Sequence, residues 1–466
     1  MEKTISDIPS RRDGDGFLSA ALQRFARLCV MIVERIMPDP FVIAILLTML
    51  TCALAYFLAP HASVPQILTS WVDGVFKIAS FAFLVALTLV TGHALSTSKP
   101  VASLLKTIAQ IPTTKQGAMT LTFLVSMTAG LLNWAVGLVV SALFAREIAK
   151  RMRVDFAWLV AAAYAGWSFY VCGISSSIAL VSASKGSPLN VIEKITGNVL
   201  PIKEFLFSPL IYLPLIILAI ILPLVFCAMM PSDAETIAAD PARLKAEDAV
   251  IPEESVSHTI AGMLDHAWIL NLALVGLGLA YIGLKISEGA FAMDLNMLVL
   301  IFLLLGLLMH WTPKAYVRAV NNAARVTGPI LLQFPIYGGI MGIMSATGLA
   351  DVIAQWFISF STTQTLPFWS FVSSVIISMF IPSAGGHWVV QAPFVVAAAE
   401  HLHVAQGAVA IAVALGESAA DMIQPMWVIP LLAIAGVGMG RVMGYTVVAF
   451  FIMCAVMGGT LLFFPH

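Results

Sequence analysis

Two acidic residues lie inside a long uncharged stretch of this sequence. Glu417 and Asp421 are four residues apart, which places both on one face of a helix, and runs without charge flank them at 404–416 and 422–440. A carboxylate held among apolar segments is costly if these cross a membrane, and such a group usually binds a coupling ion or a substrate. We therefore expect Glu417, together with Asp421, to bind a coupling proton or sodium ion. The alternative is that one of them pairs with His387 or caps a broken helix.

Polar residues also interrupt two other uncharged stretches. The motif NWAVG at 133–137 divides the first stretch, and PSAGG at 382–386 divides the second. If helices restart after these motifs, near Leu138 and His387, their free N–H groups and positive dipole ends would attract an anion. We expect substrate-binding groups at both tips, although the motifs can also be read as turns alone. The candidates are Asn133, Ser383, His387 and the glycines Gly137, Gly385 and Gly386, where a ligand can approach the backbone.

A second kind of interruption follows each of these stretches. The first is CGISSS at 172–177, and the second is GESAADMIQP at 416–425. An unwound segment exposes carbonyls to a cation or donors to a carboxylate, but serines in membrane helices can also bond only to the preceding turn. The predicted substrate-binding residues here are Ser175, Ser176, Ser177 and Gln424. If sodium is the coupling ion, its site is expected near Asn133, Ser177 and Ser383, and no other cofactor is predicted.

The composition indicates what kind of chain must position these residues. Of the 466 residues, 60% are hydrophobic and 11% are charged, and the mean hydropathy is +0.96, so the chain is too apolar for a soluble domain. The net charge of −1 argues against a nucleic-acid partner. The five cysteines are scattered and have neither disulfide nor metal spacing. We predict an all-α polytopic membrane protein, inserted without cleavage of its polar N-terminus.

The interrupted stretches predict specific membrane elements. Residues 117–151 and 366–402 each contain two apolar pieces that are too short to cross a bilayer alone, so we expect two re-entrant helical hairpins. The stretches that contain CGISSS and GESAADMIQP should form two broken transmembrane helices. No Lys or Arg occurs at mid-membrane in these segments, which favours a monoanion over a di- or tricarboxylate.

An offset of 250 residues relates the two halves of the chain. The aligned pairs include Asn133 with Ser383, Gly166 with Gly416 and Ser168 with Ser418. Glu417 and Asp421 align with the apolar Trp167 and Val171, so the acids belong to one half only. One extra helix between the halves would invert the second copy, which is typical of secondary transporters. The predicted parts are a cytoplasmic segment with an interfacial helix (1–36), a first inverted repeat (37–230), a cytoplasmic linker (231–262), a connecting transmembrane helix (263–290) and a second inverted repeat (291–466).

The distribution of positive charge predicts the orientation of the chain. Most of the 24 Lys and Arg residues fall on the same side as the N-terminus, whereas a predicted loop at 60–74 on the other side has none. By the positive-inside rule, the N-terminus is cytoplasmic.

Several motifs, in their order along the chain, resemble those of a known family. From Arg24 to the C-terminus the chain is similar to the bacterial short-chain fatty acid transporters. The resemblance implies a carrier of acetoacetate, butyrate or related short monocarboxylates in the bacterial inner membrane. It also implies a scaffold that forms a homodimer and a transport domain that moves like an elevator. The motifs that carry the resemblance are IMPDPF (36–41), TGHAL (91–95), NWAVGLVVSALFARE (133–147), PSAGGHWVVQAPF (382–394) and GE…QP.W (416–427).

The sequence does not identify the coupling ion. The family belongs to a wider ion transporter superfamily whose dicarboxylate branch has Ser-Asn-Thr signatures at the hairpin tips, and this chain lacks them. The sequence therefore predicts a cation-coupled secondary active transporter in the lipid bilayer. The alternatives are a dicarboxylate or aminoacyl anion symporter of the same superfamily, or a passive anion channel. An intramembrane enzyme is not expected, because the chain has neither a Gly-x-Ser-x-Gly nor a His-Glu-x-x-His motif.

Overall fold

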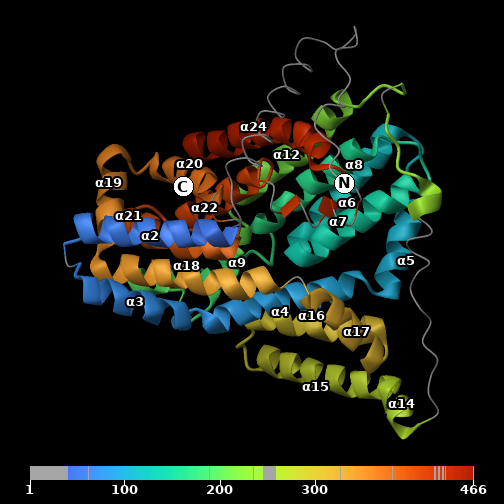
Figure 1. Ribbon diagram of the computed structural model, residues 1–466, viewed down its shortest axis with the longest axis horizontal. Helices are drawn as coiled ribbons and strands as arrows, with labels where there is room; N and C mark the ends of the chain where they lie inside the picture. Colours follow the sequence, from blue (N-terminus) through green and yellow to red (C-terminus); the bar gives the residue numbers. More distant parts are fainter. Residues whose placement is uncertain are drawn as a thin grey trace.

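The computed structural model describes residues 40–464 except for 61, 188, 235, 245–258, 326, 380, 382, 425–426, 429–430, 433–434 and 436. The predicted segment at 1–36 and much of the predicted linker lie outside the described residues. Within the described part of the chain, every regular element is a helix (Figure 1). Seven helical segments there are long and apolar enough to cross a membrane. The prediction of an all-α polytopic membrane protein is therefore confirmed.

The helices fall into two sets along the chain. The first set is α2 (Pro40–Leu58), α3 (Val64–Lys77), α4 (Ala79–Ser96), α5 (Lys99–Ile108), α6 (Lys115–Leu132), α7 (Trp134–Ala149), α8 (Phe156–Trp167), η2 (Ser168–Cys172), α9 (Ser177–Ala183), α10 (Val191–Thr196), α11 (Ile202–Leu206) and α12 (Pro209–Ala228). The short α14 (Ile260–Asp265) and α15 (Trp268–Ser287) follow. The second set is α16 (Leu295–His310), α17 (Pro313–Ala324), α18 (Gly328–Thr347), α19 (Leu349–Phe360), α20 (Leu366–Ser378), α21 (Ala384–His401), α22 (Gln406–Ala420) and α24 (Met439–Phe463).

Corresponding helices of the two sets begin at nearly constant separation. α7 and α21 begin at Trp134 and Ala384, a difference of 250, and α8 and α22 begin at Phe156 and Gln406, again a difference of 250. The order of the helices therefore repeats at the offset that the sequence suggested. The opposite orientation of the two copies in the membrane stays a prediction.

Helices of opposite halves pack together reciprocally. α18 packs against α2 and α3, while α4 packs against α16 and α17 (Figure 1). Small residues allow α3 and α18 to approach closely, because a Cβ on Gly74 would lie 2.3 Å from Gly338 O and one on Gly342 would lie 2.2 Å from Ser70 O.

The prediction of a loop at 60–74 is wrong for most of its length, because the amphipathic helix α3 begins at Val64.

The two predicted hairpins are present as helix pairs. α6 and α7 meet at Asn133, and α21 follows α20 after a short connection. The helix starts predicted near Leu138 and His387 are wrong, because α7 already begins at Trp134 and α21 at Ala384. The reason is local capping: Asn133 Oδ1 accepts from the N–H groups of the first turn of α7, which starts that helix at once.

Each hairpin packs against a broken helix of its own half. In the first half, α8 passes into the 3₁₀-helix η2, and α9 begins only at Ser177. In the second half, α22 ends at Ala420 and turns follow through Ile423. α6 packs against α8, α20 packs against α22, and η2 packs against α22, so the two broken helices lie side by side at η2.

Asp155 connects three segments beside the first broken helix. Its Oδ1 accepts from Trp158 N at 3.0 Å and caps α8, while its Oδ2 accepts from Ile237 N at 3.0 Å and from Arg441 Nη2 at 2.6 Å. The described start of the predicted linker is therefore held against α8 and α24.

Candidate substrate and coupling site

The first hairpin tip is joined to the first broken helix by neutral hydrogen bonds. Trp134 N donates to Ser175 Oγ at 2.9 Å, and Trp134 O accepts from Trp167 Nε1 at 2.7 Å. Ile174 N donates to Leu131 O at 2.9 Å. We call this set of five residues the first-tip contact. It contains no ionisable side chain.

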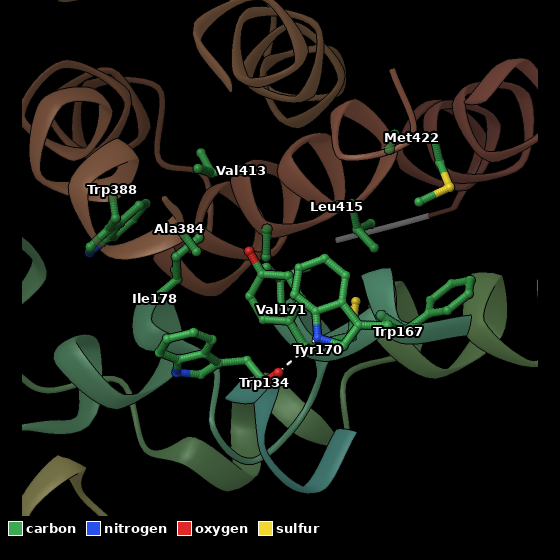
Figure 2. Packing of buried hydrophobic residues seen from close by; sticks show 14 of the residues in the cluster. Trp134, Trp167, Tyr170, Val171, Ile178, Ala384, Trp388, Val413, Leu415 and Met422 are labelled. Carbon is green, nitrogen blue, oxygen red and sulfur yellow. Dashed lines mark hydrogen bonds between the residues drawn. The ribbon is translucent and has the colours of Figure 1, made fainter. Parts of the chain in front are cut away.

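Aromatic rings surround the first-tip contact. Trp167 stacks between Tyr164, at a centroid distance of 5.4 Å, and Tyr170, at 4.7 Å. Trp427 packs against Trp134 at 5.6 Å and against Trp167 at 5.8 Å. Figure 2 shows Trp134, Trp167 and Tyr170 side by side, with the bond between the two tryptophans dashed. The 3₁₀ geometry of η2 explains the closest pair, because residues three apart eclipse there.

The second hairpin tip is joined to the second broken helix through ionisable side chains. Glu417 Oε2 accepts from Ser378 Oγ at 2.7 Å and contacts His387 Nδ1. Ser378 Oγ also lies 2.8 Å from His387 Nδ1. All three side chains are buried, and we call them the second-tip contact. The pairing of Glu417 with His387, raised as an alternative from the sequence, is present; a role of this pair in ion coupling stays a prediction.

Gln391 extends the second-tip contact along α21. Its Oε1 contacts His387 Nε2, and its Nε2 donates to Ser370 O and to Ser373 Oγ, both at 2.9 Å. Both nitrogens of the His387 ring therefore face an oxygen atom of another side chain.

The two broken helices are bonded to each other at their breaks. Ser418 Oγ donates to Ser168 O at 2.9 Å, and Tyr164 OH donates to Asp421 O at 2.9 Å. Asp421 is also the C-cap residue of α22, where its backbone N–H donates to Glu417 O at 3.0 Å. Capping of the broken helix was the structural alternative for one of the two acids.

Several buried polar atoms near these contacts have no hydrogen-bond partner among the described residues. Leaving such atoms unpaired costs free energy, and this is a common property of groups that bind a ligand or ion. Gln424 shows the pattern clearly, since its Nε2 donates to Ser378 O at 2.7 Å while its Oε1 is unpaired within the described chain. The set comprises the acceptors Glu417 Oε1, Asp421 Oδ2 and Gln424 Oε1 and the donors Asn133 Nδ2, Trp388 Nε1, Trp427 Nε1 and Tyr170 OH.

The remaining predicted polar residues act as helix caps or lie at helix starts. Ser176 Oγ accepts from Ala179 N at 3.4 Å and Ser383 Oγ accepts from Gly386 N at 3.4 Å. Ser177 is the half-buried first residue of α9. Their binding of substrate, or of sodium together with Asn133, stays a prediction.

The predicted glycines allow close packing at the tips. A Cβ on Gly137 would lie 2.5 Å from Gly130 Cα, so this glycine lets the two arms of the first hairpin approach. A Cβ on Gly386 would lie 2.6 Å from the Tyr337 ring, and one on Gly385 would lie 3.2 Å from both Phe81 and Phe334. Contact of these glycines with a substrate also stays a prediction.

Sequence reasoning missed the serines of α20. Ser370, Ser374 and Ser378 recur every fourth residue and line one buried face of that helix. This i, i+4 spacing could have indicated from the sequence that the three serines share one face of a helix. The contribution of Trp427 was also missed.

Comparisons with known proteins agree with this architecture. Two hairpins and two broken helices around a buried ionisable contact are features of a multi-span membrane transporter. The family model described as short chain fatty acid transporter matches residues 21–464. The chain belongs to the short-chain fatty acid transporter family.

Individual relatives agree with that assignment. A protein of Escherichia coli (strain K12), for which short-chain fatty acid transport is proposed, is 39% identical over 428 residues, or 91% of this chain and 96% of that protein. A Haemophilus influenzae protein with the same proposed role is 36% identical over 433 residues, or 92% of this chain and 96% of that protein.

Two solved structures share the fold. The YdaH transporter of Alcanivorax borkumensis, reported to have an unusual topology, aligns with a TM-score of 0.57 at 16% identity over 91% of this chain and 97% of its own. MtrF of Neisseria gonorrhoeae, described within a class of antimetabolite efflux pumps, aligns with a TM-score of 0.58 at 16% identity over 94% and 97%.

Proposed function

We propose that this protein is a cation-coupled secondary carrier of short-chain fatty acids or related small monocarboxylates such as acetoacetate and butyrate. The observation that carries the proposal is the second-tip contact, in which the buried carboxyl of Glu417 joins a hairpin to a broken helix. A carboxyl group in this position can link the binding of a cation to a movement of the tip. Family membership supplies the substrate class.

The substrate carboxylate would bind between the two tips. The candidates on the first side are Asn133 and Ser175–Ser177, and those on the second are Ser383, His387 and Gln424. The unpaired amide nitrogen of Asn133 is the kind of donor that a carboxylate requires. No Lys or Arg side chain belongs to either tip contact, so a co-transported cation would offset the substrate charge.

The reciprocal packing of α2, α3 and α18 with α4, α16 and α17 supports a scaffold, against which the hairpins and broken helices would move as an elevator. We propose that the protein works as a homodimer in the bacterial inner membrane with its N-terminus in the cytoplasm. The homodimer and the elevator movement rest on the family resemblance, and the orientation rests on the positive charges.

Uptake into proteoliposomes tests this function. Labelled acetoacetate and butyrate are supplied under an imposed sodium or proton gradient, with the wild type and Glu417→Gln in parallel. Protein-free liposomes measure permeation of the undissociated acids. We expect saturable, gradient-driven accumulation that Glu417→Gln abolishes. Equal, gradient-independent flux in both proteins would instead indicate a passive channel, and strong competition by succinate but not by butyrate would indicate a dicarboxylate carrier.

A further inference from the structure

The amide of Gln391 determines where the hydrogen of the His387 ring must lie. Gln391 Nε2 is 2.9 Å from Ser370 O, a carbonyl that can only accept, so the amide nitrogen must point there. Gln391 Oε1 then faces His387 Nε2. Because an amide oxygen can only accept, His387 Nε2 must carry a hydrogen.

The other ring nitrogen faces an acceptor as well. His387 Nδ1 contacts Glu417 Oε2, which also accepts from Ser378 Oγ at 2.7 Å. A neutral imidazole has a single N–H, and Nε2 already uses it, so Nδ1 of the neutral ring would present a lone pair to a carboxylate. Two such groups repel. The contact is favourable only with one proton between Nδ1 and Oε2, in either the imidazolium–carboxylate or the imidazole–carboxylic acid form.

We infer that the coupling cation of the proposed carrier is a proton held between His387 Nδ1 and Glu417 Oε2, and that losing this proton separates the second hairpin tip from α22. This inference rests on the proposed function and adds the identity of the ion. A ring nitrogen facing a carboxylate suits a proton better than sodium, since hard cations take oxygen ligands. Gln391 is a positioning residue, because it acts through His387.

Other ionisable groups face this pair from the neighbouring helices. Asp421 lies one turn further along α22, and its Oδ2 has no partner among the described residues. Tyr164 of α8 donates to Asp421 O at 2.9 Å, Tyr170 lies on η2, which packs against α22, and Tyr337 of α18 packs at Gly386 beside His387. Asp421 is the other carboxyl in this set, so it is the group that could compete for the proton.

The first-tip contact contains no pair of ionisable side chains like His387 and Glu417. The first-tip contact consists of backbone groups, a serine hydroxyl and an indole N–H, none of which changes charge near neutral pH. Proton loss would therefore release the second tip alone.

Gradient experiments in proteoliposomes test the ion. We expect an inside-alkaline pH gradient to drive acetoacetate accumulation, by up to about tenfold per pH unit for one proton per anion, and a sodium gradient at equal pH to drive none. Glu417→Gln should abolish the accumulation, and Glu417→Asp should restore part of it. Accumulation lost in Asp421→Asn but kept in Glu417→Gln would place the proton on the other carboxyl and overturn the inference. Accumulation driven by sodium and not by pH would overturn the inference while leaving a carrier. Absence of saturable uptake and exchange of short-chain acids would overturn the function and the inference together.

Gln391→Leu separates a positioning role from a structural one. Without the amide oxygen, the neutral ring can carry its hydrogen on Nδ1 and donate to the carboxylate, so the contact no longer requires an extra proton. We expect saturable acetoacetate exchange with several-fold weaker accumulation under the pH gradient. Parallel loss of exchange and accumulation would contradict this role.

Cysteine accessibility tests the release of the tip without transport. Ala384→Cys on the second tip and Ala135→Cys on the first are made in a chain whose five native cysteines are replaced by alanine. The ratio of their maleimide labelling rates removes the intrinsic rise of thiol reactivity with pH. We expect this ratio to rise several-fold between about pH 6 and about pH 9 and to become independent of pH in Glu417→Gln. A constant ratio in the unmodified second-tip contact would overturn the inference.

Discussion

Ser418 Oγ donates a hydrogen bond of 2.9 Å to the carbonyl oxygen of Ser168, and these two serines are 250 residues apart in the chain. The same offset separates the starts of α7 and α21 and those of α8 and α22. Equivalent points of the two halves therefore touch at the breaks. If the halves are inverted repeats, as the sequence predicts, this contact would lie close to the two-fold axis between them.

Ser418→Ala should lower the free energy of unfolding, because Ser168 O then loses this donor. The expected loss is about 0.6 to 1.7 kcal/mol, as for hydrogen bonds between membrane helices. Thermal unfolding of the detergent-solubilised protein would measure the loss. Ser141→Ala is the control, since within the described part of the chain Ser141 Oγ donates only to Gly137 O of its own helix. An equal loss in both variants would show that the contact between the halves adds nothing.

Ser378→Ala should impair transport more than Ser374→Ala does. Both serines are buried on α20 and bond to α22, but Ser378 Oγ donates to Glu417 whereas Ser374 Oγ donates to Val413 O at 2.7 Å. A hydrogen bond to a charged group contributes about 1.5–3 kcal/mol, which corresponds to roughly a tenfold or larger fall in the initial rate of uptake. Similar rates in the two variants would argue that Ser378 serves packing alone.

Gly166→Ala should destabilise the first half of the molecule. A Cβ at this position would lie 2.3 Å from Phe123 O, so α6 and α8 would have to separate. Overpacking of this kind costs about 1–3 kcal/mol. Gly276→Ala in α15 is the matched control, because a Cβ there meets nothing within 4 Å. The melting temperatures of the two purified variants test this expectation. An equal fall in melting temperature for Gly276→Ala and Gly166→Ala would contradict a specific effect of the α6–α8 packing.

Asp155→Ala should be considerably more destabilising than Arg441→Ala. The aspartate is 1% exposed and holds the cap of α8, Ile237 N and Arg441, whereas the arginine is 43% exposed. Loss of an N-cap alone costs about 1 kcal/mol, and Asp155→Ala also removes the acceptor of Ile237 N, whereas Arg441→Ala leaves both backbone bonds of the carboxylate in place. Thermal unfolding and limited proteolysis of the linker would compare the two variants. Equal effects would mean that the ion pair, not the capping, holds these segments together.

Local patterns predicted much of the fold. Uncharged runs with polar interruptions indicated the hairpins and the broken helices, because each depends on a few consecutive residues such as Asn133 and the turn that it caps. The pairing of Glu417 with His387 was among the alternatives that the sequence raised, since ionisable groups are rare in apolar segments.

The partners of these residues could not be predicted in the same way. Which side chain meets Glu417 depends on the rotation of α20 against α22, so Ser378 was missed although its spacing from Ser370 and Ser374 was regular. The contact of Trp427 with Trp134 similarly joins residues from opposite halves. Long-range packing of this kind leaves no mark on the sequence near either residue.

The acid of the second-tip contact has no counterpart in the first half, where Trp167 stands at the equivalent position. If the inference about the proton holds, each transport cycle carries a single proton with a single monoanion, and no net charge crosses the membrane. Such a carrier would be indifferent to membrane voltage, and its limiting accumulation would follow the pH difference alone. A cell would then concentrate these acids only while its interior stayed more alkaline than its surroundings, and a collapse of that difference would turn the same protein into an exit route.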